Sequence, residues 1–526
     1  MLTPPKPRAV LLAFIALYTG YRLLTIGGFP MSPDEAYYFA WSRAPAVSYY
    51  DQPGMVAWVD WLFARPWPRP TAFTVRLGAV ALSGLVIWLC YWAYRQYRSD
   101  EKEAVAFALV FSTLPFTWLT GIVMIHDTAL LPWLILAYGM TARLARDDGR
   151  TADWLGLALA LTGAMYAKLS AVMAAWGIVL YMIWSPRGRR WWKRWQPYAA
   201  GGLVSVLYLP VILWNFQHGW INVKAVGELT ATGPLSLATR LWHLAEYLIS
   251  QPLMFSPLIG LAAFYALLRG IGHAWKRPED DRVTLPVCLA LPVFLYFAQL
   301  AFRSRVYGNW PGIAYFPVAM LAWSEIAERR RSGPWTGLLG RRFLLTGEVL
   351  NLVFLLLAGF HLQFGILRPA FAAVEKKFNL DRRLDWRLDL DFGGWDEMAA
   401  LTERYRPRAD FILTRRYQVA SMLEFLLPDQ PRVYAENRGL RGNQWDLWPG
   451  PERFAGQTAL YVDIKRMPPS VQRRCDEVVP LQAPFRVGER KRPVKKWWVY
   501  LCRGWKGRDA PGPAGSAPAA EPEDAE

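Results

Sequence analysis

Long and mostly apolar segments recur along the first 365 residues, and they limit the folds that are open to this chain. A helix needs roughly 20 such residues to cross about 30 Å of hydrocarbon. The number and uniformity of the segments argue against one large soluble helical core and indicate a membrane protein with many spans. The segments lie at 9–29, 71–94, 104–122, 128–145, 198–215, 251–269, 284–302, 309–327 and 343–365.

The stretch 154–184 is apolar for too long to be one helix, and Lys168 lies in its middle. A lone ammonium buried in the membrane is costly. We therefore expect two short helices that meet near Lys168. The total becomes about eleven spans.

The net charge of +18 is high enough to suggest nucleic-acid binding, but the positions of the basic residues give another reason. Lys and Arg gather in alternate short loops, as they do on the cytoplasmic side of membrane proteins. This pattern predicts a cytoplasmic N-terminus, a periplasmic region after about residue 366, and no nucleic-acid partner. The basic loops are at 95–102, 143–150, 187–194, 269–282 and 329–342.

Three regions follow from composition. Residues 1–365 form the predicted transmembrane domain, with a long first outer loop at 30–70. Residues 366–505 mix short β-rich pieces with turn residues and predict an α/β domain. Residues 506–526 are rich in Pro, Ala, Gly and Glu and predict a disordered tail. Cys475 and Cys502 fall in the α/β region, either as a disulfide or as two buried thiols.

Acidic residues cluster in the first outer loop. Ser32 and Pro33 are typical of a helix start, which places Asp34 and Glu35 in the first turn. These acids either complement the helix dipole or provide a carboxylate that takes a proton from an acceptor hydroxyl. Asp51 lies further along the same loop, where it is either a turn-capping residue or the second member of a carboxylate pair.

Further ionisable residues fall at the predicted outer ends of the membrane helices. Asp127 either caps the following helix or adds a third acid to a site. Lys168 requires an anion, and Arg303 and Arg305 occupy a short outer loop against the usual charge bias. No acid in that loop can pair with these arginines, so they either extend to lipid headgroups or bind the oxygens of a phosphorylated lipid.

The segment from Asn215 to His218 offers hydrogen-bonding groups beside aromatic rings, in Trp214-Asn215-Phe216-Gln217-His218. Such groups are used to bind sugars, although one His among aromatic residues is more often structural. We therefore place Asn215 and His218 among the residues of the predicted substrate cavity.

Taken in order, these segments resemble the bacterial polyprenyl-phosphate-sugar-dependent glycosyltransferases of the GT-C fold, a group related to protein O-mannosyltransferases and to the lipid A aminoarabinose transferase. Each segment is a weak motif alone, and the ordered set covers about residues 10–500. The segments are Pro33-Asp34-Glu35-Ala36-Tyr37-Tyr38, Tyr49-Tyr50-Asp51-Gln52-Pro53, His126-Asp127-Thr128-Ala129-Leu130, Ala167-Lys168-Leu169-Ser170-Ala171, Trp214-Asn215-Phe216-Gln217-His218-Gly219-Trp220, Asn309-Trp310-Pro311, Arg416-Tyr417-Gln418-Val419-Ala420-Ser421 and Asn443-Gln444-Trp445-Asp446-Leu447-Trp448-Pro449.

The resemblance implies an inner-membrane enzyme whose site faces the periplasm. It implies a polyprenyl-phosphate sugar as donor and a lipid or glycan acceptor, with lipid A or the lipopolysaccharide core as first choice. Protein, another envelope glycan and another lipid are the alternative acceptors, and a lipid-linked sugar flippase is the alternative class. A transporter should show inverted repeats and broken helices at the membrane midplane. We find neither, and the charges cluster at one face.

The resemblance also implies residue roles. Asp34, with Glu35 beside it, is placed at the reacting centre. The residues assigned to the donor phosphate are Lys168, Arg303 and Arg305, and those assigned to the cavity are Asp51, Asp127, Asn215, His218 and Asn309. No cofactor is certain. A divalent metal is possible, with Asp51 as one ligand, but Glu228 stands near the place where some relatives have a His.

Overall fold

The computed structural model describes residues 6–147, 149–230, 235–332, 337–378, 392–437, 440–481, 485–489 and 492–507. Apart from Lys506 and Gly507, the predicted tail lies outside the described residues. The chain forms two compact units. The first contains residues 1–26, 52–59 and 75–360, and the second contains residues 27–51, 60–74 and 361–526. Most of the first outer loop therefore packs with the C-terminal region.

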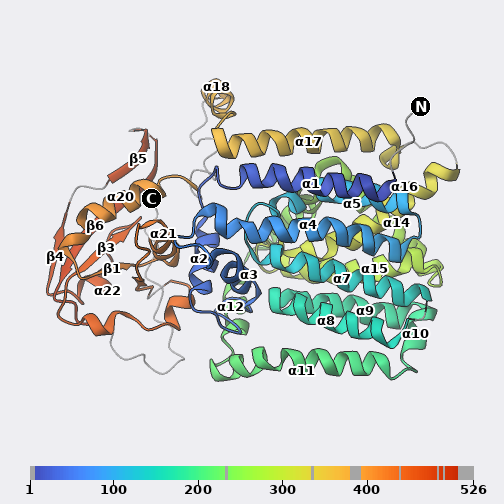
Figure 1. Cartoon of the computed structure of the whole chain (residues 1–526), viewed down its shortest axis with the longest axis horizontal. Helices are drawn as coiled ribbons and strands as arrows, with labels where there is room; N and C mark the ends of the chain where they lie inside the picture. Colours follow the sequence, from blue (N-terminus) through green and yellow to red (C-terminus); the bar gives the residue numbers. More distant parts are fainter. Residues whose placement is uncertain are drawn as a thin grey trace. The chain divides into compact units, whose positions relative to one another are not determined.

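The first unit is a bundle of helices, and its long members lie with their axes nearly parallel in Figure 1. Helix α9 packs closely on α15 at Gly177, where a Cβ atom would lie 2.7 Å from the Cα of Leu289. The helices are α1 (Pro7–Thr25), α4 (Ala72–Tyr97), α5 (Glu101–Thr113), α6 (Pro115–Leu119), α7 (His126–Asp147), α8 (Thr151–Ala167), η1 (Leu169–Ala171), α9 (Val172–Trp184), α10 (Pro186–Trp191), α11 (Gln196–Gln217), α12 (Ile221–Thr230), α13 (Leu237–Phe255), α14 (Pro257–Lys276), α15 (Asp281–Ala301), η2 (Trp310–Ala314), α16 (Tyr315–Ser332), η3 (Gly337–Leu339) and α17 (Arg341–Phe364).

Seven helices among the described residues are long and apolar enough to cross a membrane: α1, α4, α7, α11, α14, α15 and α17. The other predicted spans also fall on helices, but these are shorter or interrupted. Proline lacks a backbone N–H, and Pro115 divides the predicted span at 104–122 into α5 and α6. The predicted count of eleven thus remains a prediction, while the helical membrane architecture is established.

The predicted break at Lys168 is confirmed. Helix α8 ends at Ala167, and Lys168 itself is extended, with φ −157° and ψ 132°, before η1 and α9 begin. In contrast, α13 has no counterpart among the predicted spans. Its Arg240, His243 and Glu246 interrupt the apolar run and hide a helix of 19 residues from a search for long apolar segments.

The predicted inner loops lie on one face of the helical unit, because their side chains pair with one another. Arg8 pairs with Glu101 at 2.8 Å, and Arg98 pairs with Glu328 at 2.6 Å. Arg187 reaches the carbonyl oxygen of Arg146 at 3.0 Å. Arg146 also donates to the carbonyl oxygen of Arg95 at 3.2 Å. Together these contacts join the N-terminus to the loops at 95–102, 143–150 and 187–194 and to Glu328 beside the loop at 329–342, as the alternation of charge predicts.

The second unit contains the predicted α/β domain. Its six-stranded mixed sheet has the order β2-β1-β3-β6-β4, and β5 also pairs with β6. Strand β1 is parallel to β2 and β3, whereas β6 runs antiparallel to β3, with Tyr461 opposite Tyr500. The elements of the unit are α2 (Pro33–Ser42), α18 (Arg368–Phe378), α20 (Trp395–Tyr405), η4 (Arg406–Arg408), β1 (Phe411–Thr414), α21 (Tyr417–Leu426), β2 (Val433–Ala435), η5 (Gln444–Asp446), η6 (Pro451–Phe454), β3 (Ala459–Asp463), α22 (Pro469–Gln472), β4 (Glu477–Pro480), β5 (Phe485–Glu489) and β6 (Arg492–Arg503), with α3 (Met55–Ala64) divided between the two units.

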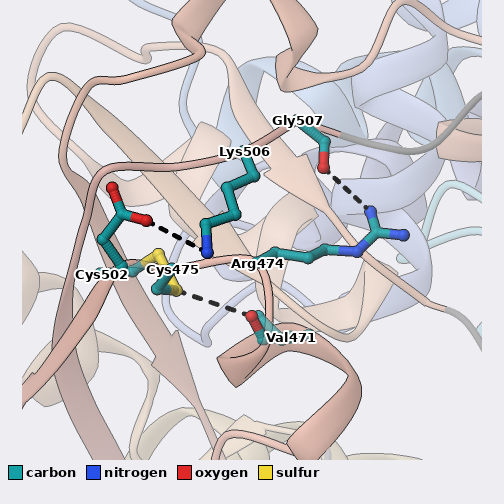
Figure 2. Close-up of a disulfide and its surroundings, with 7 residues drawn as sticks. Val471, Arg474, Cys475, Cys502, Lys506 and Gly507 are labelled. Carbon is teal, nitrogen blue, oxygen red and sulfur yellow. Dashed lines mark hydrogen bonds and ion pairs between the residues drawn. A yellow bond between two sulfur atoms is a disulfide. The ribbon is translucent and has the colours of Figure 1, made fainter.

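Cys475 and Cys502 form a disulfide, which decides between the two alternatives left by the sequence (Figure 2). The bond ties Cys475, three residues beyond the end of α22, to strand β6, and both cysteines belong to the buried core of the sheet. Beside it, Lys506 pairs with Asp476 at 3.1 Å, and Arg474 donates to the carbonyl oxygen of Gly507 at 3.4 Å. These contacts fasten the end of β6 to the segment that follows α22.

Candidate active site

Helix α2 begins as the sequence predicts. The Ser32 hydroxyl accepts a hydrogen bond from the Glu35 amide at 3.2 Å, and the Glu35 carboxylate accepts one from the Ser32 amide at 3.1 Å. This reciprocal pair is a capping box, and Glu35 is fully buried within it. Asp34, one residue earlier, is exposed. The two acids thus have different surroundings, which suit Glu35 to holding the helix start and leave the Asp34 carboxylate at the surface.

Asp51 joins the first outer loop to the C-terminal part of the second unit. One carboxylate oxygen accepts a hydrogen bond from the Tyr37 hydroxyl at 2.8 Å, and the other pairs with Arg441. The Tyr37 hydroxyl in turn accepts one from the Gln444 amide at 2.9 Å. Burial raises the pKa of Tyr37 well above its usual value, and the Asp51 charge raises it further, so the phenol stays protonated as a donor.

Aromatic rings surround this network. The Tyr37 ring lies 4.5 Å from that of Tyr417 and 5.7 Å from that of Trp445, centroid to centroid. Tyr50 donates its amide hydrogen to the Gln444 side chain at 2.8 Å. Four of the segments that carry the resemblance therefore meet within the second unit, although about 400 residues separate them in the chain.

A second cluster lies in the helical unit. Lys168 donates to Asp127 at 2.7 Å, and the side-chain amide of Asn309 donates to the other Asp127 oxygen at 3.2 Å. The side chains of Lys168 and Asp127 are 11% and 5% exposed, so the pair is screened little by solvent. The anion that Lys168 was expected to require is thus supplied within the protein by Asp127.

Local structure explains why these three side chains meet. The extended conformation of Lys168 interrupts the helical hydrogen bonds, and the Gln52 side chain accepts the Leu169 amide hydrogen at 2.9 Å. On the other side, Tyr138 of α7 donates to the carbonyl oxygen of Ile313 at 3.1 Å and holds η2 beside α7. Asn309 directly precedes η2, and its side chain reaches Asp127. Asp127 is in the first turn of α7, and its carboxylate reaches Lys168 and Asn309.

The arginine loop differs from expectation in one respect. Arg305 pairs with Glu246 of α13 through its Nε at 3.0 Å and its Nη2 at 2.5 Å. The inference that Arg305 lacks an acidic partner is therefore wrong, because the partner comes from a helix 59 residues earlier rather than from the same loop. The pair is open to solvent, with 61% and 32% of the two side chains exposed. Arg303 is exposed as well.

The predicted sugar-binding segment has local partners. Asn215 donates to the Asn222 side chain at 2.8 Å and accepts from the Asn222 amide at 3.2 Å, which joins α11 to α12. The His218 ring stacks on Trp214 with 4.0 Å between centroids and remains exposed. These contacts fit a structural role for Asn215 and do not bring either residue to Asp127.

The residues near Asp51 do not fit a metal centre. Both oxygens of Asp51 already hold Tyr37 and Arg441, and Glu228 is exposed on α12. Within the part of the chain that the structure describes, no group of three or more His, Cys, Asp or Glu side chains is arranged to hold a metal ion. The chemistry considered below therefore contains no step through a metal.

Sequence reasoning missed Asp60. This residue of α3 is fully buried, and neither carboxyl oxygen has a hydrogen-bond partner among the described residues. Burial raises its pKa well above the usual value, and the nearby Glu35 charge adds to the effect. An acidic residue in the otherwise apolar sequence of α3 was the signal that could have pointed to Asp60. Arg441 and Glu246 were missed as well, since nothing in a single sequence relates them to Asp51 and Arg305.

The helical unit, its interrupted helix at Lys168 and the mixed sheet of the second unit together define the GT-C fold of membrane glycosyltransferases. The solved structure of ArnT from Cupriavidus metallidurans bound to undecaprenyl phosphate is similar over 93% of this chain and 98% of that one, with a TM-score of 0.58 and 13% identity. The apo structure of the same protein is similar over 94% of this chain and 98% of that one, with a TM-score of 0.57 and 13% identity. These likenesses establish the fold.

Sequence comparisons agree with the fold. Residues 51–214 match the family of dolichyl-phosphate-mannose-protein mannosyltransferases. The chain is also 26% identical over 323 residues to the lipid A galacturonosyltransferase RgtD of Rhizobium johnstonii, which is 60% of this chain and 65% of that protein. The match thus spans slightly less than two thirds of that relative.

Proposed function

We propose that the chain is a membrane glycosyltransferase that moves a sugar from a polyprenyl-monophosphate carrier to lipid A or the lipopolysaccharide core. The observation that carries the proposal is the meeting of Asp127, Lys168 and Asn309 within a GT-C helical unit. These residues come from three segments that carry the resemblance, and the matched family region contains the first two.

Lys168 is suited to bind the donor phosphate even though it pairs with Asp127. An ammonium has three hydrogens to donate, and the described contacts use one of them. Asp127 fixes the ammonium in place, so its remaining hydrogens meet a phosphate without first losing side-chain freedom. In this proposal Asp127 is a positioning residue for Lys168, and Asn309 holds Asp127.

Arg303 and Arg305 supply the exposed part of the same proposed phosphate site. The Arg305–Glu246 pair is open to solvent, and such pairs contribute about 0–1 kcal/mol. A lipid phosphate that offers two oxygens to the guanidinium fork therefore competes with Glu246 at little cost. The pairing keeps Arg305 oriented until the donor arrives.

The proposed reaction is a direct displacement. The acceptor oxygen forms a bond to the anomeric carbon of the sugar, and the bond between that carbon and the phosphate oxygen breaks. The electron pair leaves with the polyprenyl phosphate, whose negative charge the cations stabilise. The resemblance alone assigns Asp34 the role of accepting the proton of the acceptor hydroxyl. Attack from the side opposite the phosphate inverts the anomeric centre.

The acceptor and the cellular orientation belong to the same proposal. The relative from Rhizobium johnstonii is described as acting on lipid A, which supports lipid A as the acceptor here. With the N-terminus cytoplasmic, the proposed site and the C-terminal unit face the periplasm of a bacterial inner membrane. Reporter fusions at about residues 190 and 400 should report opposite sides, and the same side for both would contradict this orientation.

The mass profile of lipid A and core oligosaccharide from a strain that lacks this chain tests the function. The proposal predicts the loss of one sugar mass from one of these molecules and its return on complementation. Loss of that sugar together with accumulation of the polyprenyl-phosphate sugar on the cytoplasmic side would favour a flippase, and an unchanged profile would contradict lipid A and the core as acceptors. A change confined to glycoproteins would move the acceptor from lipid to protein.

A further inference from the structure

A cavity of about 460 Å³ opens within the helical unit between α5, α14, α16 and α17. Its walls are mostly apolar, and six alanines leave space between larger side chains such as Phe111, Phe255 and Trp323. The alanines that line it are Ala106, Ala262, Ala263, Ala319, Ala322 and Ala327. Along α5 the lining runs from Asp100 to Leu114, a length of about 21 Å at 1.5 Å per residue.

The charged lining is concentrated where α5 begins, α16 ends and α17 begins. Arg331 is neutralised there by Asp100 at 2.9 Å and Glu103 at 2.6 Å. Lys102, Arg330 and Arg341 also line this end and are exposed, and the described residues provide none of them with an ion pair. At this end four cations face two acids, which leaves an excess positive charge at the mouth. The third acid of the lining, Glu348, lies seven residues further along the chain from Arg341 and accepts a hydrogen bond from the Thr113 hydroxyl at 2.7 Å.

The cavity lies far from the candidate active site. Its mouth shares the face on which Arg98 pairs with Glu328, and that face also contains Arg146 at the end of α7. Asp127 is at the other end of α7, about 29 Å away along the helix. None of Asp127, Lys168 and Arg305 lines the cavity.

We propose that this cavity binds one anionic phospholipid, with an acyl chain between the alanine-lined walls and its phosphate at Lys102, Arg330 and Arg341. An apolar interior with a cationic mouth complements such a lipid in both parts, and Arg provides a fork for phosphate oxygens. Only one acyl chain of the lipid has to enter the interior of the cavity. This proposal does not depend on the reaction that the protein catalyses.

Native mass spectrometry of the purified full chain in detergent tests the proposal. Phosphatidylglycerol, phosphatidylcholine and inorganic phosphate are added separately at equal concentration. We expect one phosphatidylglycerol to be retained, with at least tenfold weaker binding of phosphatidylcholine. Inorganic phosphate should not displace the lipid, because it cannot occupy the apolar interior.

Two pairs of variants separate the two parts of the site. Arg330→Gln with Arg341→Gln should weaken phosphatidylglycerol binding by about tenfold or more, since each lost charge-assisted contact is worth about that factor. The matched control replaces Arg189 and Arg190 of α10, which are exposed and do not line the cavity. Ala322→Leu should fill the cavity and lower binding, whereas Ala199→Leu on the exposed side of α11 should not.

Thermal unfolding of each variant shows whether it is folded, and Ala319→Leu replaces Ala322→Leu if the latter is not. Equal retention of phosphatidylglycerol in the parent and the cavity variants would overturn the proposal. Equal loss in the Arg189 and Arg190 control would reduce the site to general surface charge and overturn it as well. Displacement by inorganic phosphate alone would assign the cations to a soluble anion instead.

Discussion

Replacing Asp127 by Asn should destabilise the helical unit and greatly lower activity, because it leaves the Lys168 ammonium without its counter-charge. The two side chains are 5% and 11% exposed, so water cannot fully replace the lost carboxylate. Removing one member of a buried ion pair typically costs about 3–5 kcal/mol. Lys168→Gln should cost less, since Asp127 retains the hydrogen bond from Asn309.

A double-mutant cycle measures the coupling. The variant that combines Asp127→Asn with Lys168→Gln should be more stable than the sum of the single changes by about 0.5–3 kcal/mol. The exposed Arg305–Glu246 pair is the matched control, and a cycle with Arg305→Gln and Glu246→Gln should give a coupling of about 0–1 kcal/mol. Unfolding in detergent, followed by circular dichroism, provides the free energies. Additive effects at Asp127 and Lys168 would refute the buried pair.

Three further changes test other parts of the structure. Asp34→Asn should remove most transfer activity, measured by initial rates, and leave the midpoint of thermal unfolding unchanged. Glu35→Gln should lower that midpoint, because Glu35 forms the capping contact at the start of α2. The reverse pattern would assign the catalytic role to Glu35 and the structural role to Asp34. Because the pKa of Asp60 is raised in the folded state, the parent protein should lose stability as the pH rises above about 4. Asp60→Asn should not show this loss. Equal slopes of unfolding midpoint against pH in the two proteins would contradict a raised pKa at Asp60. Replacing both Cys475 and Cys502 by Ser should destabilise the C-terminal unit by about 2–4 kcal/mol, measured by unfolding under oxidising conditions. The parent protein should lose the same free energy of unfolding when its disulfide is reduced.

Much of the helical unit follows from the sequence, because membrane helices are encoded by local composition. The break at Lys168 was predictable, since a charged residue inside a long apolar run cannot stay unpaired in the membrane. Helix α13 was not, because Arg240, His243 and Glu246 give it the composition of a loop. Its Glu246 then supplies the partner that a search within the loop of Arg305 could not find.

The candidate site was predicted in part. The pattern Ser32-Pro33-Asp34-Glu35 contains the helix start, and Ser32 and Glu35 form the expected cap. The pairing of Asp51 with Arg441 depends on a contact between residues 390 positions apart, which no spacing rule encodes. The buried Asp60 could have been noticed as an acid within an apolar helix.

The most direct test of the central proposal is a transfer assay with the purified full chain, a polyprenyl-phosphate sugar and lipid A. We expect lipid A to gain the mass of one sugar while an equal amount of polyprenyl phosphate is released, and we expect Asp34→Asn to abolish both. If the chain moved the intact lipid-linked sugar across vesicle membranes and lipid A gained no mass with any polyprenyl-phosphate sugar, the proposed glycosyltransferase function would be contradicted.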